Sequence, residues 1–343
     1  MLFFRLLICC ISKVFYNVKF DVIIQKKYLN GDNMPPLSRL KGKNLSWVIN
    51  KAISIIVENI NILYYRWRRI IHEGHIYRCQ DEYRFDRSSL TRARDAGISG
   101  IMRLYNEERY LESSIESYID QLDELIIVHN RCTDSTPAIC EKMRKKYPHK
   151  IKVFHYIPAV APPGSLEHVA LDPRDERSLV NYYNFALSKT TKEYVMKVDG
   201  DCILITDAFL KIREYILSKN PSDEYNYFFG INLKRNDVGE LALRKSAPLT
   251  AGYDHGIFRV SKNTFFKHAY NYEVFSHKSK EKSNGIVFYH LKSLKEDLAV
   301  DSHGLDTKFY RRYFSDRLSQ DFIEWSDFPQ TKGMPRPDYI NDL

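Results

Sequence analysis

Apolar residues are arranged in two different patterns between residues 97 and 199. Short continuous apolar runs are typical of buried parallel strands, whereas apolar residues three or four positions apart mark one face of a helix. The strands are expected at 97–104, 124–128, 151–155 and 194–198, and the helices at 108–120, from 136 onward and at 178–188. This alternation predicts a doubly wound α/β domain with a largely parallel sheet.

The pattern changes after residue 201, where a predicted helix at 207–218 is followed by shorter apolar runs. These runs, at 225–233, 240–244, 256–260 and 286–291, predict a mixed edge to the sheet. We therefore expect one domain over residues 96–300, divided near residue 205. Residues 157–177 are rich in proline and read as a long loop, a kind of segment that usually has a function or moves.

Residues 1–95 differ from the rest of the chain. Ser46 is a suitable N-cap for a helix that runs to about residue 72, with apolar positions near one face and arginines at its end. Such a helix can lie on an anionic membrane surface or pack on the next domain, and both alternatives stay open. The apolar run Met1–Ile11 is too short to span a bilayer. We expect a basic and aromatic tail over residues 301–343, with a helix over Thr307–Trp325.

The chain of 343 residues has a formal net charge of +9. This charge favours phosphate-bearing partners, which include nucleic acid, anionic lipid and sugar nucleotides, without choosing among them. Tyr310–Phe314 is the one hint of stacking on a nucleic acid, and we expect no nucleic-acid role. The six cysteines form no CxxC pair, which indicates free thiols in a reducing compartment and hence a cytoplasmic location.

Two carboxylates follow the strand predicted at 194–198. Asp199 and Asp201 flank Gly200 at the carboxyl end of this strand, where open α/β sheets bind their ligands. Paired acids at such a place can hold a hard divalent cation through oxygen ligands, and the cation can neutralise a diphosphate. The alternative is an ordinary acidic turn, since Asp and Gly are common turn residues.

Three stretches occur in a characteristic order, namely Ile98–Glu107, Glu124–Thr136 and Asn184–Asp201. Together they resemble the GT-A glycosyltransferases of the family 2 type. The resemblance covers residues 97–205 and extends more weakly to residue 291. It implies a GT-A fold in which residues 96–205 bind a nucleotide-sugar donor and residues 206–300 bind the acceptor. It also implies a divalent metal, Mn²⁺ or Mg²⁺, and inversion at the anomeric carbon.

The resemblance assigns roles to individual acids. Asp199 would contact the donor ribose and the metal shell, and Asp201 would bind the metal. His290 ends an apolar run and fits the late histidine ligand of some GT-A enzymes, although a structural histidine is the alternative. Inverting transfer needs a base near the acceptor hydroxyl, and Asp254, with His255 beside it, is our first candidate. The rival candidates for the base are Glu273, Glu296 and Asp297.

Several polar residues stand where the family lines its donor site. For Asn106, Glu107 and Asp134 the alternative is a role at the N-terminus of the helix that follows. The chain departs from the family at His129 and Asn130, which replace an acid, and at Arg131, which replaces a glycine. The identity of the nucleotide base therefore stays open. Lys292 and Lys295 either meet the diphosphate or are solvated. The expected donor-binding residues are Arg103, Asn106, Glu107, Asn130, Asp134, Asn184 and Asp199.

The sequence thus predicts transfer of a sugar from a nucleoside diphosphate to a glycan or lipid-linked acceptor. We expect this in the synthesis of a cell-surface polysaccharide of the lipopolysaccharide type, in the cytoplasm and with peripheral contact at the inner face of the membrane. One alternative is a nucleotidyltransferase, although Arg103–Glu108 lacks the glycine-rich phosphate loop of that class. Another is a membrane-associated binding protein that retains the fold without catalysis.

Overall fold

The computed structural model describes residues 81–250, 255–268, 273–277, 279–295 and 321–343. The helix predicted from Ser46 and the base candidates Asp254, Glu296 and Asp297 lie outside these residues. Most of the predicted C-terminal helix also lies outside them. Within the described part of the chain, no helix combines the length and apolar character needed to cross a membrane.

Four parallel strands form the first half of the sheet, in the order β3-β2-β1-β4. The strands are β1 (Asp95–Leu104), β2 (Glu124–Asn130), β3 (Ile151–Tyr156) and β4 (Lys192–Val198). Each coincides with an apolar run identified in the sequence, and β2 is buried along almost its whole length. The predicted parallel sheet is confirmed.

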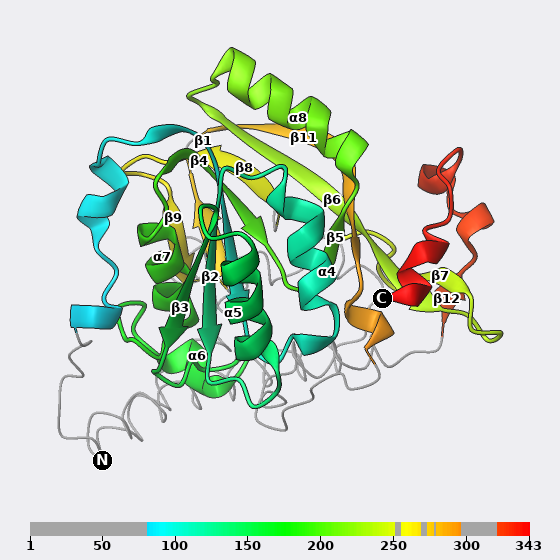
Figure 1. Cartoon of the computed structure of the whole chain (residues 1–343), viewed down its shortest axis with the longest axis horizontal. Helices are drawn as coiled ribbons and strands as arrows, with labels where there is room; N and C mark the ends of the chain where they lie inside the picture. Colours follow the sequence, from blue (N-terminus) through cyan, green and yellow to red (C-terminus); the bar gives the residue numbers. More distant parts are fainter. Residues whose placement is uncertain (1–80, 251–254, 269–272, 278, 296–320) are drawn as a thin grey trace, which may run out of the picture. The chain divides into compact units, whose positions relative to one another are not determined.

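Helices cover both faces of this half, as Figure 1 shows. The helices α4 (Glu108–Ile119) and α5 (Thr136–Lys146) pack on one face, in a core that includes Leu125 and Ile127 of β2. The helix α7 (Leu179–Ser188) packs on the other face, with Ile126 and Val128. Because successive residues of a strand point to opposite faces, one apolar run supplies both cores. The doubly wound architecture is thereby confirmed.

The second half of the sheet is mixed, as expected of the GT-A fold. Strand β8 runs antiparallel to β4, and β6 runs antiparallel to β8. Strand β11 is parallel to β6 and antiparallel to β5, so its carboxyl end lies beside the start of β5. The remaining elements are β5 (Cys202–Leu204), α8 (Thr206–Lys219), β6 (Glu224–Arg235), β7 (Leu241–Arg244), β8 (Gly256–Arg259), β11 (Lys280–His290) and β12 (Phe322–Ile323).

Several short elements were not predicted. The loop at 157–177 contains the helix α6 (Leu166–Ala170), which begins after the N-cap Ser165. Strands β9 (Phe265–His268) and β10 (Glu273–Ser276) form a separate antiparallel pair, and β12 of the C-terminal tail pairs with β7. Runs of two to five residues are too short to show a period, so only tertiary contacts define them.

Candidate active site

The turn between β4 and β5 carries the two predicted acids. Gly200 packs so closely against the end of β1 that an added Cβ would lie 2.6 Å from Leu104 Cδ2 and 3.3 Å from Glu107 Cβ. Glycine is therefore required by close approach rather than by an unusual backbone angle. This packing fixes Asp199 and Asp201 against the loop that follows β1.

Asp201 is buried between the side chains of His290 and Lys295. Its Oδ1 lies 3.4 Å from His290 Nε2, and its Oδ2 accepts a hydrogen bond of 2.8 Å from Lys295 Nζ. Its backbone carbonyl accepts a hydrogen bond of 2.8 Å from the N–H of Leu291. The structure thus brings together Asp201 and His290, which were proposed as metal ligands although 89 positions separate them in the sequence numbering (290 minus 201).

Asn232 of β6 orients the imidazole of His290. The Nδ2 of Asn232 donates to the carbonyl of Ala247 at 2.8 Å, which leaves Oδ1 as an acceptor. His290 Nδ1 lies 2.6 Å from that oxygen and therefore carries a proton. The other ring nitrogen, Nε2, is turned toward Asp201. Such a hydrogen bond fixes the ring of a metal-binding histidine, and the sequence contained no signal for Asn232.

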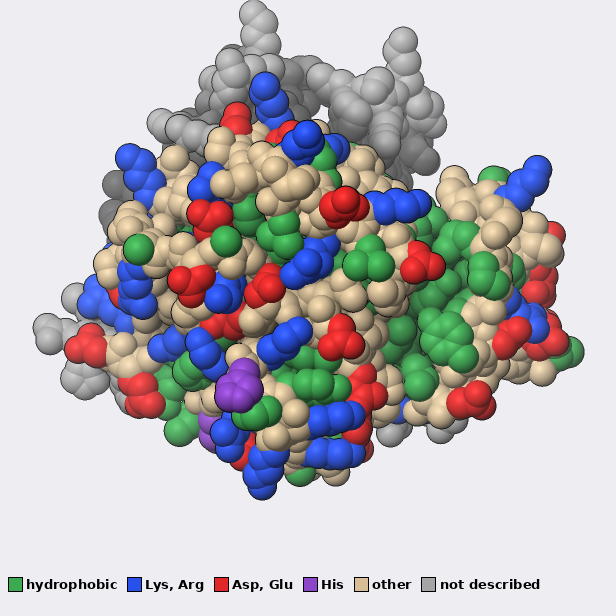
Figure 2. Space-filling view, turned by 45° about the horizontal axis from the view of Figure 1, so that its top comes forward, with side chains coloured by type: hydrophobic (Ala, Val, Ile, Leu, Met, Phe, Trp, Pro, Cys, Tyr) green, Lys and Arg blue, Asp and Glu red, His purple; other side chains and the backbone are tan. Residues whose placement is uncertain are grey.

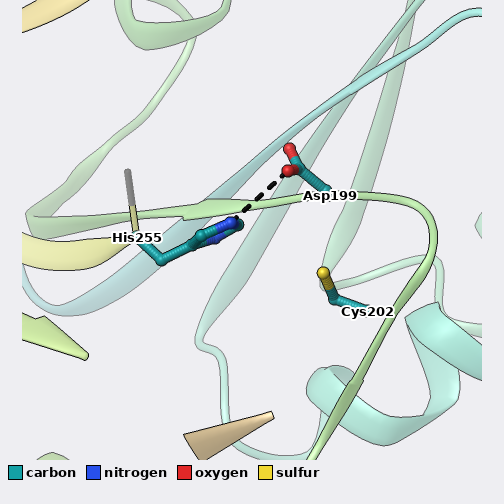
Figure 3. A group of neighbouring side chains, drawn as sticks. All are labelled: Asp199, Cys202 and His255. Carbon is teal, nitrogen blue, oxygen red and sulfur yellow. Dashed lines mark ion pairs between the residues drawn. The ribbon is translucent and has the colours of Figure 1, made fainter. Parts of the chain in front are cut away.

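Asp199 has a different set of neighbours. His255 Nε2 lies 3.5 Å from Asp199 Oδ2, as Figure 3 shows, and Arg103 Nη2 lies 3.9 Å from Oδ1. The guanidinium of Arg103 stacks on the ring of Tyr183 in α7, 3.0 Å from the ring centre. Arg103 Nε is buried without a hydrogen-bond partner among the described residues, so it can donate to a ligand.

The buried thiol of Cys202 lies close to both acids. Its Sγ belongs to two groups of ligand atoms, one with Asp199 and His255 and one with Asp201 and His290. Within each group the atoms lie within 4.8 Å of one another, a separation that a single cation can bridge. Carboxylates suit Mg²⁺ and Mn²⁺, and nitrogen and sulfur donors add affinity for transition metals. These residues therefore fit a divalent cation and favour Mn²⁺ over Mg²⁺.

Lys295 bridges Asp201 and Glu107, with an ion pair to each. Burial raises the pKa of Asp201, but the charges of Lys295 and His290 outweigh it, so the pKa of that carboxyl lies well below its usual range. Burial and the charge of Asp201 raise the pKa of Glu107 to about 7. Burial lowers the pKa of Lys295, but the charges of Asp201 and Glu107 raise it more. Lys295 therefore keeps its charge.

Asn106 and Asp134 join the loops that follow β1 and β2. Asn106 Oδ1 accepts a hydrogen bond of 2.8 Å from the N–H of Thr133, and Asp134 Oδ2 accepts one of 3.1 Å from the N–H of Glu108. Asn106 also has a positive φ of 53°, which asparagine tolerates better than most residues. Both side chains thus shape the rim of the site, and their contact with a donor stays a prediction.

Asn130 and Asn184 hold backbone segments in place. The amide of Asn130 donates to the carbonyls of Tyr156 and Pro158, at 2.6 and 2.7 Å. The amide of Asn184 exchanges two hydrogen bonds with the backbone of Phe266 in β9, at 2.9 and 2.8 Å. These hydrogen bonds give both amides a structural role, and their contact with a donor stays a prediction.

The glycosyl transferase family 2 model matches residues 99–156, which run from β1 to the end of β3. Over 63 residues, the chain is 41% identical to the minor teichoic acid biosynthesis protein GgaA of Bacillus subtilis. That stretch covers 17% of this chain and only 14% of GgaA. The match supports the family 2 resemblance over the first three strands.

Two solved structures are similar at low sequence identity. Residues 1–349 of S. aureus TarS are 18% identical, over 64% of this chain and 72% of that chain, with a TM-score of 0.35. Glucosyl-3-phosphoglycerate synthase from Mycobacterium tuberculosis, in complex with Mn²⁺, uridine diphosphate and phosphoglyceric acid, is 14% identical. The alignment covers 68% of this chain and 80% of that chain, with a TM-score of 0.33. The chain is thus similar to glycosyl transferase family 2 over residues 99–156, a segment that lies within its α/β domain.

Proposed function

We propose that this protein is an inverting, metal-dependent glycosyltransferase that uses a nucleoside-diphosphate sugar. The observation that carries the proposal is that Asp201 meets His290, and Asp199 meets His255, around Cys202 at the carboxyl end of β4. The adjoining strands β1 and β2 lie in the segment that matches family 2. Ligands of open α/β sheets bind at this end of the strands.

Asp201 and His290 would hold the divalent cation, with Asp199 beside them. When bound there, the cation supplies positive charge that offsets the negative charge on the departing nucleoside diphosphate. Arg103 would bind the donor through its buried Nε, which has no hydrogen-bond partner in the described part of the chain. The loops shaped by Asn106, Glu107, Asn130 and Asp134, and the contact of Asn184 with β9, would complete the donor pocket, with residues 206–300 binding the acceptor.

Asp254 remains our candidate for the base that takes the proton of the acceptor hydroxyl. The residue that follows it in the sequence, His255, lies 3.5 Å from Asp199, and this neighbour in the chain supports the candidate. In the reaction, the acceptor oxygen forms a bond to the anomeric carbon while the bond from that carbon to the phosphate oxygen breaks. Of the rivals, Glu273 begins β10, and Glu296 and Asp297 lie outside the described residues.

The acceptor is proposed to be a glycan or lipid-linked polymer of the bacterial surface. The likeness to a teichoic acid biosynthesis protein supports this class and favours teichoic acid over lipopolysaccharide. On the face shown in Figure 2, Lys and Arg side chains are interspersed with Asp and Glu. That surface differs from the single-sign stripe of a nucleic-acid binding protein. A cytoplasmic location, with residues 1–72 at the membrane, is part of the same proposal.

A panel of nucleoside-diphosphate sugars with Mn²⁺ tests the activity through release of the nucleoside diphosphate. Replacing Asp201 by Asn should lower turnover by about 100-fold or more, as loss of a group that stabilises transition-state charge does. Asp237→Asn, which changes an exposed acid between β6 and β7, is the matched control and should keep full turnover. Release of pyrophosphate would instead indicate nucleotidyl transfer, and failure to bind any donor would indicate a non-catalytic protein.

A further inference from the structure

Lys295 is paired with the carboxylate of Asp201, the residue expected to bind the metal. Its side chain is only 13% exposed, and its ammonium contacts both Asp201 and Glu107. The 3₁₀ helix Lys292–Leu294 leads directly into it. The backbone hydrogen bond from Leu291 to the carbonyl of Asp201 and the burial of Leu294 anchor that helix. The lysine is therefore held in the site by its own chain segment.

A divalent cation and this ammonium would compete for the same carboxylate. Asp201 Oδ1 faces His290, and Oδ2 accepts the hydrogen bond from Lys295 at 2.8 Å. Since like charges repel strongly in a buried site, a metal ion on Asp201 would drive the ammonium away from Oδ2. Glu107 offers the displaced ammonium a second carboxylate that it already contacts.

We propose that Lys295 holds the cation position at Asp201 until a divalent metal and a nucleoside diphosphate displace it together. Glu107 then retains the ammonium at the edge of the site, where it pairs with the diphosphate. Lys295 is thus a positioning residue that makes metal binding depend on the donor. This inference rests on the proposed function, because it assigns the diphosphate to the same site.

The proposed role of Lys295 predicts that binding of the divalent metal and binding of the nucleoside diphosphate strengthen each other. Metal alone must break the contact of Lys295 with Asp201, whereas metal with diphosphate replaces that contact by a new ion pair. Each ligand should therefore raise the affinity of the other by the same factor, which for typical couplings is about 5- to 150-fold. Removal of the ammonium should abolish most of this factor, because it relieves the competition and also removes the new ion pair.

Calorimetric titration of Mn²⁺ into the full-length protein, with and without saturating UDP, measures the coupling. We expect Lys295→Met to bind Mn²⁺ alone about tenfold more tightly than the wild type and to lose most of the coupling to UDP. Lys295→Arg retains a positively charged side chain, so its affinity for Mn²⁺ and its coupling to UDP should stay close to those of the wild type. Lys219→Met removes the same charge from an exposed position at the end of α8 and is the control, expected to retain both affinities within about twofold.

The outcomes separate this inference from the proposed function. If Lys295→Met, shown to be folded by circular dichroism, binds Mn²⁺ alone no more tightly than the wild type, the lysine does not compete and the inference is wrong. The proposed function survives that result as long as the wild type binds Mn²⁺ with UDP and Asp201→Asn does not. If the wild type binds neither ligand, both proposals are wrong.

Discussion

At the scale of single residues, the two acids of the β4–β5 turn differ because their neighbours differ. The side chain of Asp199 is 27% exposed and lies near Arg103, whereas that of Asp201 is 4% exposed and lies between His290 and Lys295. Asp199, the more exposed acid, can contact a donor, whereas Asp201 is enclosed by His290 and Lys295. One glycine between them fixes both orientations.

Asn232 should control metal affinity through His290. Replacing Asn232 by Leu removes the acceptor for His290 Nδ1, so the ring loses its orientation. Loss of such a partner typically weakens metal binding by about 10- to 100-fold. Electron paramagnetic resonance of free Mn²⁺ measures this directly. Unchanged affinity in a folded Asn232→Leu protein would show that His290 is a structural histidine.

Gly200 should tolerate no side chain unless space is made for it. Gly200→Ala places a methyl group 2.6 Å from Leu104 Cδ2, and such overpacking costs about 1–3 kcal/mol of unfolding free energy. Leu104→Val removes the obstructing carbon, so the double variant should recover part of the loss beyond additivity. A double-mutant cycle by urea denaturation checks this, and strictly additive effects would contradict the packing argument.

At the scale of elements, Glu124 at the start of β2 ties neighbouring strands together. Its carboxylate accepts hydrogen bonds from Ser99 of β1, Lys152 of β3 and the N–H of Thr191 before β4, at 2.7, 2.6 and 2.8 Å. The carboxylate of Glu124 thus connects the four parallel strands near their amino ends. The opposite, carboxyl end of the same strands carries the candidate site.

The stability contributed by Glu124 should depend on pH. Burial raises its pKa, but the hydrogen bonds from Lys152, Ser99 and Thr191 outweigh it, so the pKa is below the usual value in the folded state. A lowered pKa stabilises the fold above the unfolded pKa of about 4.3, and the stabilisation is lost as the pH falls through the folded value. Glu124→Gln should therefore cost about 1–3 kcal/mol at pH 7 and progressively less at acid pH.

Urea denaturation of this variant at pH 7 and below pH 4 provides the measurement. Glu141→Gln, which loses an exposed ion pair with Arg144, is the matched control and should leave the stability almost unchanged at both pH values. A cost for Glu124→Gln that stays constant between the two pH values would mean that the charge of the carboxylate does not matter.

At the scale of the whole described domain, the candidate site draws on both halves of the sheet. Asp199 and Asp201 follow β4 of the first half, whereas His255 immediately precedes β8 and His290 ends β11 in the second half. A ligand held by all of them would link strands that belong to different parts of the sequence. Binding should therefore stabilise the domain as a unit.

UDP together with Mn²⁺ should raise the melting temperature of the protein. A ligand at 100 times its Kd adds about 2.7 kcal/mol to stability, which corresponds to roughly 5 °C for a domain of this size. Chelation of the metal or Asp201→Asn should remove the shift, and Asp237→Asn should keep it. A shift of the same size in the Asp201 variant would place the ligand elsewhere.

The sequence by itself determined the parallel half of the domain and its two acids. Long apolar runs such as those of β1 and β2 define buried strands whatever surrounds them, and the family match at residues 99–156 falls on this part. Asp199 and Asp201 were identifiable because a strand, a glycine and the acids are neighbours in the chain. Their nearness to His290 was expected only through the family resemblance.

The tertiary structure alone decided which distant residues meet those acids. Asn232, Cys202 and the double contact of Lys295 follow from the register of β11 against β5 and β6, which pairs His290 with both Cys202 and Asn232. Local periodicity carries no information about such register between strands far apart in sequence, because many pairings bury the same apolar residues. Packing of the whole sheet selects one of these pairings, and this pairing determines which side chains surround the turn between β4 and β5.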